Sequence, residues 1–218
     1  MKIISNEAGR AHQTFIADEV NPPGGYHVSD AIRLISERYR FSKIPSLEDA
    51  QSTGAIFTNG QLISGNQKIN IQEIGVLKDA VFATAKDTTT AEFILDDLST
   101  WAEQVVGWRP SITKIPRKYD NVAVVEFEAN IEGCLKVFNE FISSYNGMLA
   151  TLYNKTFSAT LYRIDFGVES LGAKLANSDF RVERRVGMPF SSNRFHCAAP
   201  LKTEMHMELL ELFERTLS

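Results

Sequence analysis

The clearest hydrophobic pattern in the sequence lies over residues 89–106. Apolar residues recur there every three or four positions, which places them along one side of an α-helix. We expect Thr89 to cap the start of this helix with Glu92 reaching back to it, and Gly107 to let the chain leave it. The opposite side is acidic. The apolar side needs a sheet or a second helix to cover it, and it consists of Ala91, Ile94, Leu95, Leu98, Trp101, Ala102 and Val105.

Three further stretches show helical spacing. The first begins at Ser29, the second covers 131–145 and ends before Asn146 and Gly147, and the third begins at Thr203. Each carries a run of polar residues opposite its apolar side. All three are therefore predicted to pack against one face of a larger structure.

Alternation of apolar and polar residues predicts the strands. A tight hairpin is expected at Asn59 and Gly60, because both residues tolerate a positive φ. The alternation slips near Glu73 and Gly75, which indicates a bulge. The remaining strands are expected over 68–77, 80–86, 121–128, 156–166 and 179–186, with a short one around 194–197.

The order of these elements after the hairpin, β-β-α-β-α-β-β-α, predicts an α+β fold. Its sheet is expected to be mixed but largely antiparallel, with helices packed on one face. We expect one α+β domain over 1–218, since the sequence shows no internal repeat and no flexible linker. The loops at 21–25 and 41–54 are candidate joints between a small N-terminal subdomain (1–54) and a main domain (55–218).

Composition is that of an ordinary globular protein, with 44% hydrophobic and 23% charged residues among 218. A chain of this length buries enough surface to fold without disulfides or metal. Its net charge of −4 argues against indiscriminate binding to nucleic acid, which needs a broad basic surface. Cys134 lies on the apolar side of a predicted helix and is expected in the core. The first residues resemble neither a signal peptide nor a membrane span, so a cytoplasmic location is expected.

Motifs for cofactors and metals are absent from the sequence. No glycine-rich loop has the spacing of a phosphate-binding motif, and the histidines His12, His27, His196 and His206 include no helical i, i+4 pair. We therefore expect no cofactor and no metal of these familiar kinds. Cys197 with His206 is the one cysteine–histidine combination to consider for nucleophilic catalysis.

Carboxylates at strand positions give an alternative function. Glu126, Glu128, Asp165 and Glu183 could bind a divalent cation if the fold brings them together, since hard cations prefer oxygen ligands. Such a cluster would suit a metal-dependent phosphodiesterase or nuclease.

Basic residues give a second alternative. Arg184 interrupts the apolar side of a predicted strand, and a buried arginine requires a partner. With Arg185 and Arg194 it forms a candidate anion-binding group. A nucleic-acid-binding module could combine the loop from Arg109 to Lys118 with Arg181, Arg185 and Arg194.

Segregation of charge supports the leading hypothesis. The helix over 89–106 carries the acids Glu92, Asp96, Asp97 and Glu103, and the loop that follows carries the bases Arg109, Lys114, Arg117 and Lys118. Opposite charges separated in this way favour docking on a protein partner or self-association. We therefore expect a non-catalytic subunit or adaptor that acts through these residues within a multi-protein assembly, with no membrane involved.

Overall fold

The computed structural model describes residues 1–25, 27–129, 131, 138–156, 159, 162–167 and 179–217. Its strands are β1 (Lys2–Thr14), β2 (Ala55–Ser64), β3 (Gln67–Val76), β4 (Ala80–Ala85), β5 (Lys118–Glu126), β6 (Arg163–Gly167), β7 (Asp179–Arg184) and β8 (Arg194–Ala199). Its helices are α1 (Ala17–Val20), α2 (Val28–Tyr39), α3 (Leu47–Ser52), α4 (Thr88–Val105), α5 (Asn139–Tyr153) and α6 (Thr203–Leu217), with a 3-10 turn, η2, over Phe190–Ser192.

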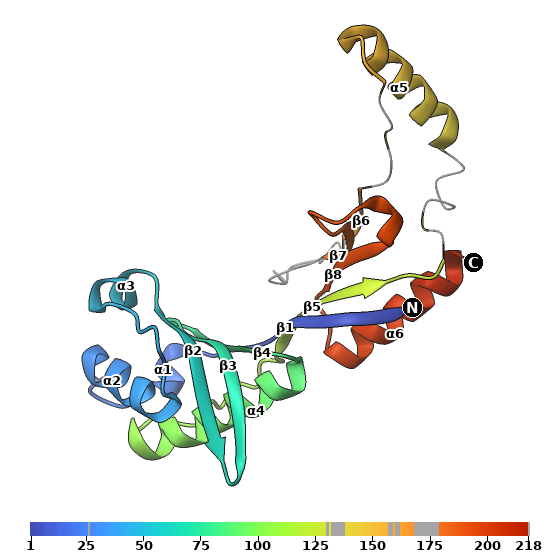
Figure 1. Ribbon diagram of the computed structural model, residues 1–218. Coiled ribbons are helices and arrows are strands. Elements are labelled where there is room, and N and C mark those ends of the chain that lie inside the picture. Colours follow the sequence, from blue (N-terminus) through green and yellow to red (C-terminus); the bar gives the residue numbers. More distant parts are fainter. Residues whose placement is uncertain are drawn as a thin grey trace.

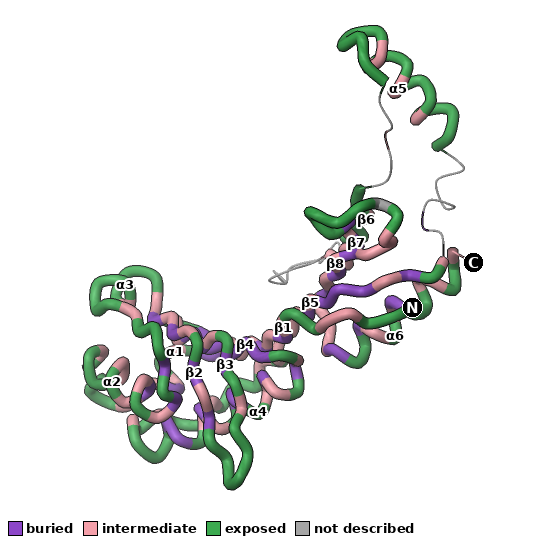
Figure 2. Tube along the Cα trace, in the orientation of Figure 1, coloured by how far each residue is buried: buried purple, intermediate pink, exposed green. Residues whose placement is uncertain are grey.

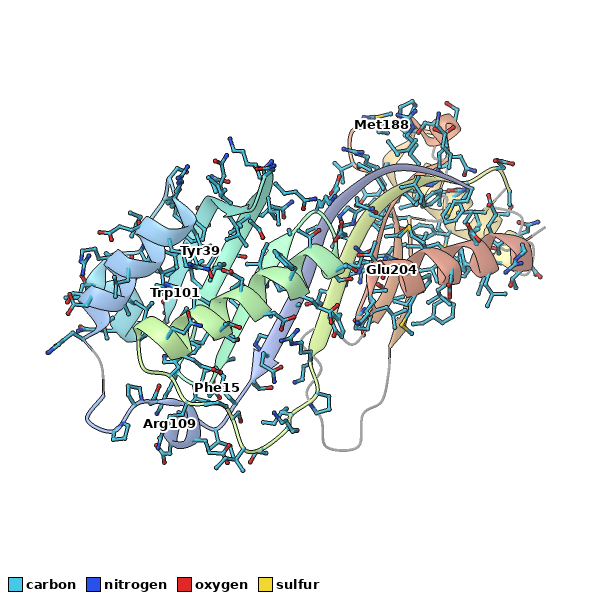
Figure 3. All side chains as sticks on the ribbon, turned by 90° about the horizontal axis from the view of Figure 1, so that it is seen from below. Phe15, Tyr39, Trp101, Arg109, Met188 and Glu204 are labelled. Carbon is cyan, nitrogen blue, oxygen red and sulfur yellow. The ribbon has the colours of Figure 1, made fainter. Side chains whose placement is uncertain are left out.

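The eight strands within these residues form one sheet in the order β2-β3-β4-β1-β5-β8-β7-β6 (Figure 1). Every neighbouring pair is antiparallel. Helices α4 and α6 lie on the same face of the sheet (Figure 3). The α+β class with helices on one face is therefore confirmed. Within the described residues, no helix is both long enough and apolar enough to cross a membrane.

The first hydrophobic core lies beneath α4, which packs on β1 and β4. The helix buries the apolar side that its spacing predicts, including Ile94, Leu95 and Leu98 at 0% exposure. Its cap is Asp87, whose side chain accepts a hydrogen bond from Thr90 N at 2.7 Å, and not Thr89 as expected. Asp87 can take this role because its extended backbone places the carboxylate over the first turn.

A second core lies beneath α6, which faces β5, β8 and β7 (Figure 2). Phe195 and Cys197 of β8 pack here with Leu210 of α6. The two cores are joined through a small group of buried polar side chains rather than through apolar contacts. These are Thr88, Asn121, Thr203 and His206.

The sheet consists of two copies of one β-β-β-β-α unit. Exchanging β1–β4 and α4 with β5–β8 and α6 leaves the strand order unchanged. Gly9 pairs with Asn121 where β1 meets β5, and Phe15 follows Gly9 at the same spacing as Phe127 follows Asn121. The expectation of no internal repeat is thus wrong at the level of topology.

The expected turn at Asn59 and Gly60 is wrong, because β2 continues through both residues and turns at Gly65. Asn59 does take a positive φ of 57°, but it does so within β2, where the buried positions change parity. Ile71 and Ile74 of β3 both reach the first core although their parity differs. The change of parity is therefore real, but the bulge expected near Glu73 and Gly75 is wrong, because the register of β3 with β2 and with β4 stays constant through these residues.

Other boundaries also differ from expectation. The helix expected over 131–145 is described over 139–153, and it continues through Gly147 because apolar spacing continues beyond that residue. Part of the expected range, with Cys134, lies outside the described residues. The loop expected at 41–54 contains α3, and the cap of α2 is His27 rather than Ser29. The strand expected over 156–166 is described from Arg163.

Candidate protein-binding surface

Charges on the outer side of α4 are used within the chain. The Asp97 carboxylate accepts hydrogen bonds from the Arg38 guanidinium at 2.7 Å and from the Tyr39 hydroxyl at 2.8 Å. Arg38 also lies 5.4 Å from the ring centroid of Trp101, and Tyr39 sits beside that ring (Figure 3). Burial raises the pKa of Tyr39 strongly and the Asp97 carboxylate adds to the rise, so the phenol remains a donor.

Two further acids of α4 have partners from distant parts of the sequence. Asp96 forms an ion pair with Arg117 at 2.5 Å. Glu92 accepts hydrogen bonds from Lys202 at 3.0 Å and from the Tyr119 hydroxyl at 2.5 Å. Burial opposes ionisation of Glu92, but these two donors outweigh it and lower its pKa. These charges therefore stabilise the fold and are not held ready for another protein.

The basic loop after α4 is also tied to the body of the protein. Arg109 donates to the backbone carbonyls of Asp18 and Asn21, each at 2.6 Å. Within the part of the chain that the structure describes, Glu103 and Lys114 have no ion-pair partner. Of the eight charges expected to bind a partner, the geometry leaves these two most open to one.

Two of the four carboxylates considered as metal ligands, Glu126 and Asp165, are paired with arginines. Glu126 forms an ion pair with Arg194 at 2.7 Å, and that hydrogen bond lowers the pKa of Glu126. The Glu128 side chain is 84% exposed. Among the described residues, no group of three or more histidine, cysteine, aspartate or glutamate side chains could hold a metal ion.

The remaining two carboxylates lie on β6 and β7. Asp165 accepts from Arg181 at 2.8 Å and from Arg163 at 2.5 Å, and these bonds lower its pKa. Glu183 is hydrogen-bonded to Tyr162, whose pKa it raises. Together with the Glu126 pair, they give the helix-free face of the sheet an alternating pattern of charge.

That pattern continues into the first half of the sheet. Arg10 of β1 pairs with Glu73 of β3 at 2.6 Å and lies 4.4 Å from the ring centroid of Phe82. Lys118 begins β5 on the same face, beside His12 of β1. Arg10, Arg181 and Arg194 on this face are thus each paired with a carboxylate, which reduces the positive charge that they offer to a phosphate group.

The cysteine–histidine combination is buried in the second core. Cys197 and His206 are both 0% exposed. Burial raises the pKa of the Cys197 thiol, which keeps it protonated, whereas a nucleophilic cysteine needs an electropositive and open setting. His206 uses Nδ1 for a 2.7 Å hydrogen bond with Asn121 Oδ1, and burial lowers its pKa to about 4. The pair is part of the packing.

The three arginines considered for anion binding do not converge. Arg184 is 5% exposed on the helix-bearing side of β7, with its guanidinium 5.2 Å from the ring centroid of Phe195. Arg185 lies 3.6 Å from a Glu7 carboxylate oxygen. Arg194 is on the opposite face, where it holds its own carboxylate partner. Arg184 was expected to be buried, and it is.

A hollow of about 920 Å³ lies between β3 and the first turns of α4. Its walls include Lys68 and Ile69 from β3, and Thr89 and Phe93 from α4. The hollow contains no buried titratable group, so nothing in it indicates a catalytic role.

Helix α5 extends away from the sheet (Figure 1) and carries an exposed apolar surface. No residue of α5 is buried (Figure 2). Phe141, Met148 and Leu152 are 67%, 70% and 73% exposed. We call the exposed row that contains them the α5 stripe, and it consists of Phe138, Phe141, Tyr145, Met148 and Leu152.

Spacing within the α5 stripe is three, four, three and four residues, which is the repeat of a helix that packs along another surface. Phe141 and Tyr145 stack with ring centroids 6.2 Å apart, so the stripe presents a continuous surface. Glu140 is the one charged residue in the helix. Fully covering one large apolar side chain stabilises a structure by about 1.5–3 kcal/mol, so leaving this row in water is costly.

Sequence reasoning identified the beginning of this row as the apolar side of a helix, but it stopped the helix at Asn146 and Gly147. Met148 and Leu152 continue the same spacing beyond those residues, and that was the available signal. Spacing alone does not show whether the fold leaves such a row uncovered.

No protein family model matches this sequence, and no curated protein is similar to it. Among solved structures, the fold is similar to Methanococcus jannaschii TBP at 14% identity, with a TM-score of 0.44, over 99% of this chain and 97% of that chain. We draw no functional conclusion from a likeness at this level.

Proposed function

We propose that this protein is a non-catalytic subunit or adaptor, and that it joins a protein assembly through α5. The observation that supports this is the α5 stripe, a row of five large apolar side chains, four on a helix in which nothing is buried and one, Phe138, at its N-cap. Exposed apolar rows of this size are typical of helix-in-groove and helix-on-sheet binding. The charged surface on α4 is assigned a smaller role, because most of its charges have partners in the same chain.

Two observations favour binding over catalysis or nucleic-acid contact. The candidate nucleophile and its histidine are both fully buried. The arginines of the helix-free face lie against Glu73, Glu126 and Asp165, which reduces the positive charge that they offer to a phosphate backbone. No observation favours a second function strongly enough to place it beside the first.

A direct test compares wild type with Met148→Glu, which places a charge in the middle of the stripe. Ile112→Glu is the matched control, because Ile112 is 83% exposed in a loop far from α5. Sedimentation velocity measures self-association, and affinity capture from the source organism's extract followed by mass spectrometry identifies other partners. Loss of association in Met148→Glu alone supports the proposal. A wild type that is monomeric and captures nothing beyond what Met148→Glu captures contradicts it.

A further inference from the structure

We infer that the surface covered by the α5 stripe belongs to a second copy of this chain, and that two copies exchange their α5 helices. Each helix would pack on the β6 side of the other copy. This inference rests on the proposed function and names the partner. It follows from comparing the two halves of the fold.

In the first half, helices cover the outer strand of the sheet. The chain leaves β1, forms α1, α2 and α3, and enters β2, and both α2 and α3 pack against β2. Ile35 and Tyr39 of α2 are buried there, and Phe57 of β2 is 0% exposed. The outer strand of this half is thus fully covered on its helix-bearing side.

In the second half, the corresponding strand is uncovered. The chain leaves β5, forms α5 and enters β6, so α5 holds the place in the sequence that α2 holds in the first half. Phe166 of β6 nevertheless is 56% exposed, and every residue of α5 lies outside the core. Among the described residues of this half, α5 therefore has no surface that it packs on, and β6 has no helix that covers it.

The uncovered surface is continuous with the second core. Phe166 lies 6.0 Å from Phe180 of β7 between ring centroids, and Phe180 lies 5.9 Å from Phe213 of α6. Phe213 in turn contacts the fully buried region at Phe127, with centroids 5.8 Å apart. We call Ile164, Phe166 and Phe180 the β6 surface. An apolar helix placed on it would extend the core by one layer, as α2 does on β2.

We infer a second copy as the partner because the α5 stripe and the β6 surface are both exposed in the same chain. The α5 helix extends from the body while the β6 surface remains in water (Figures 1 and 2). Reciprocal exchange covers both stripes and both β6 surfaces and closes with two-fold symmetry, leaving no free site for further growth. Large aromatic side chains bury about 150–250 Å² each, so two such contacts bury on the order of 2,000 Å², which is enough for a stable dimer.

The test uses the full chain with two charge substitutions, one on each surface. Met148→Glu disrupts the α5 stripe and Phe166→Glu disrupts the β6 surface, while Ile112→Glu serves as the control. Both target side chains are more than half exposed, so folding should survive, and circular dichroism with thermal melting checks this. Sedimentation velocity over a hundredfold range of concentration gives the mass. We expect dimers for wild type and Ile112→Glu, and monomers for the other two.

Mixing the two disrupted variants separates exchange from other modes of pairing. A Met148→Glu chain keeps an intact β6 surface, and a Phe166→Glu chain keeps an intact α5 stripe. The mixture should therefore recover a heterodimer with one intact contact, which neither variant forms alone. A dimer that tolerates Phe166→Glu but not Met148→Glu would overturn the exchange and leave the proposed function standing, with α5 binding elsewhere.

Two other outcomes are equally clear. If wild type is monomeric and a double variant, Met148→Cys with Phe166→Cys, forms a disulfide within one chain, α5 covers its own β6 surface and the exchange is wrong. If wild type is monomeric, the double variant forms no such disulfide and wild type captures no partner through α5, the inference and the proposed function both fail.

Discussion

Thr88 and Thr203 exchange hydrogen bonds across the boundary between the two halves of the fold. The backbone N–H of Thr88 donates to Thr203 Oγ1 at 3.0 Å, and the backbone N–H of Thr203 donates to Thr88 Oγ1 at 2.9 Å. Each threonine is the first residue of its helix, so each side chain satisfies a free N–H of the other helix. Two helices that cover different cores are thereby capped by each other.

Removing one of these hydroxyls should destabilise the protein substantially. Thr203→Val keeps the shape of the side chain but leaves the Thr88 N–H without its acceptor and removes one of the two acceptors of the Asn121 amide in a buried site. Each buried polar group without a partner costs about 1–3 kcal/mol, so we expect a loss of about 2–4 kcal/mol in the free energy of unfolding. Urea denaturation measures it. Thr203→Ser retains the hydroxyl and should lose much less, and equal losses in the two variants would contradict this account.

Acid should destabilise the protein through His206. Asn121 Oδ1 accepts from Nδ1–H, and Nε2 is buried without a hydrogen-bond partner among the described residues, so an added proton has no acceptor. The pKa is lowered from 6.5 to about 4, which means that the unfolded chain takes up this proton more readily. Stability from this group is complete above pH 6.5 and is lost as the pH falls toward 4, by about 3 kcal/mol in total.

The check is the free energy of unfolding measured at several values of pH between 7 and 4. His206→Gln should be less stable at pH 7 but should show a flatter profile over this interval. The pKa of His12 is also lowered by burial. The variant His12→Gln is therefore the control, because it measures how much of the pH dependence comes from His12 and not from His206. An unchanged slope in His206→Gln would refute the assignment.

Neighbouring aspartates on α4 should differ sharply in their effects. Asp97→Asn removes a carboxylate that accepts from both Arg38 and Tyr39 in a half-buried site, and we expect a loss of about 1–2 kcal/mol. Asp96→Asn removes an ion pair whose aspartate is 63% exposed, so the loss should stay below about 1 kcal/mol. Thermal or chemical denaturation compares the two variants. A larger loss in Asp96→Asn would show that the roles assigned to these pairs are reversed.

Two glycines should respond oppositely to a methyl group. A Cβ at Gly9 would lie 2.2 Å from Thr88 N, where the start of α4 crosses β1, so Gly9→Ala should cost more than about 3 kcal/mol. A Cβ at Gly147 meets nothing within 4 Å, and Gly147→Ala should stabilise α5 locally by about 0.5–1 kcal/mol. Hydrogen exchange measures the second effect in the amides of α5. Faster exchange there would contradict a continuous helix through Gly147.

Local patterns predicted those elements whose environment is uniform along their length. Helix α4 keeps one periodicity and strand β4 is buried along its whole length, and both lie within two residues of their expected ends. Strand β1, which spans 13 residues, is marked less clearly in the sequence. Its pairing with β5 shifts near Ile4 and again near Glu7, and each shift interrupts the alternation that marks a strand in the sequence.

The candidate site was harder to predict because it depends on distant partners. Asp97 looked available to another protein, but Arg38 reaches it from a helix formed 59 residues earlier. Conversely, Met148 and Phe166 resemble ordinary core residues in sequence, and only the fold shows that each remains in water. Residue spacing describes which side of an element is apolar, but what covers that side is a property of the whole chain.

The position of β1 also has a consequence for how the chain folds. This strand pairs with β4 on one side and with β5 on the other, so both halves are built on the same segment. During synthesis, the first half can close as soon as residues 80–105 have formed, because all its strands precede that point. The second half must then assemble on an edge that is already in place. The second half therefore pairs with a strand that the first half has already folded, and unfolding the first half removes β1, the strand with which β5 pairs.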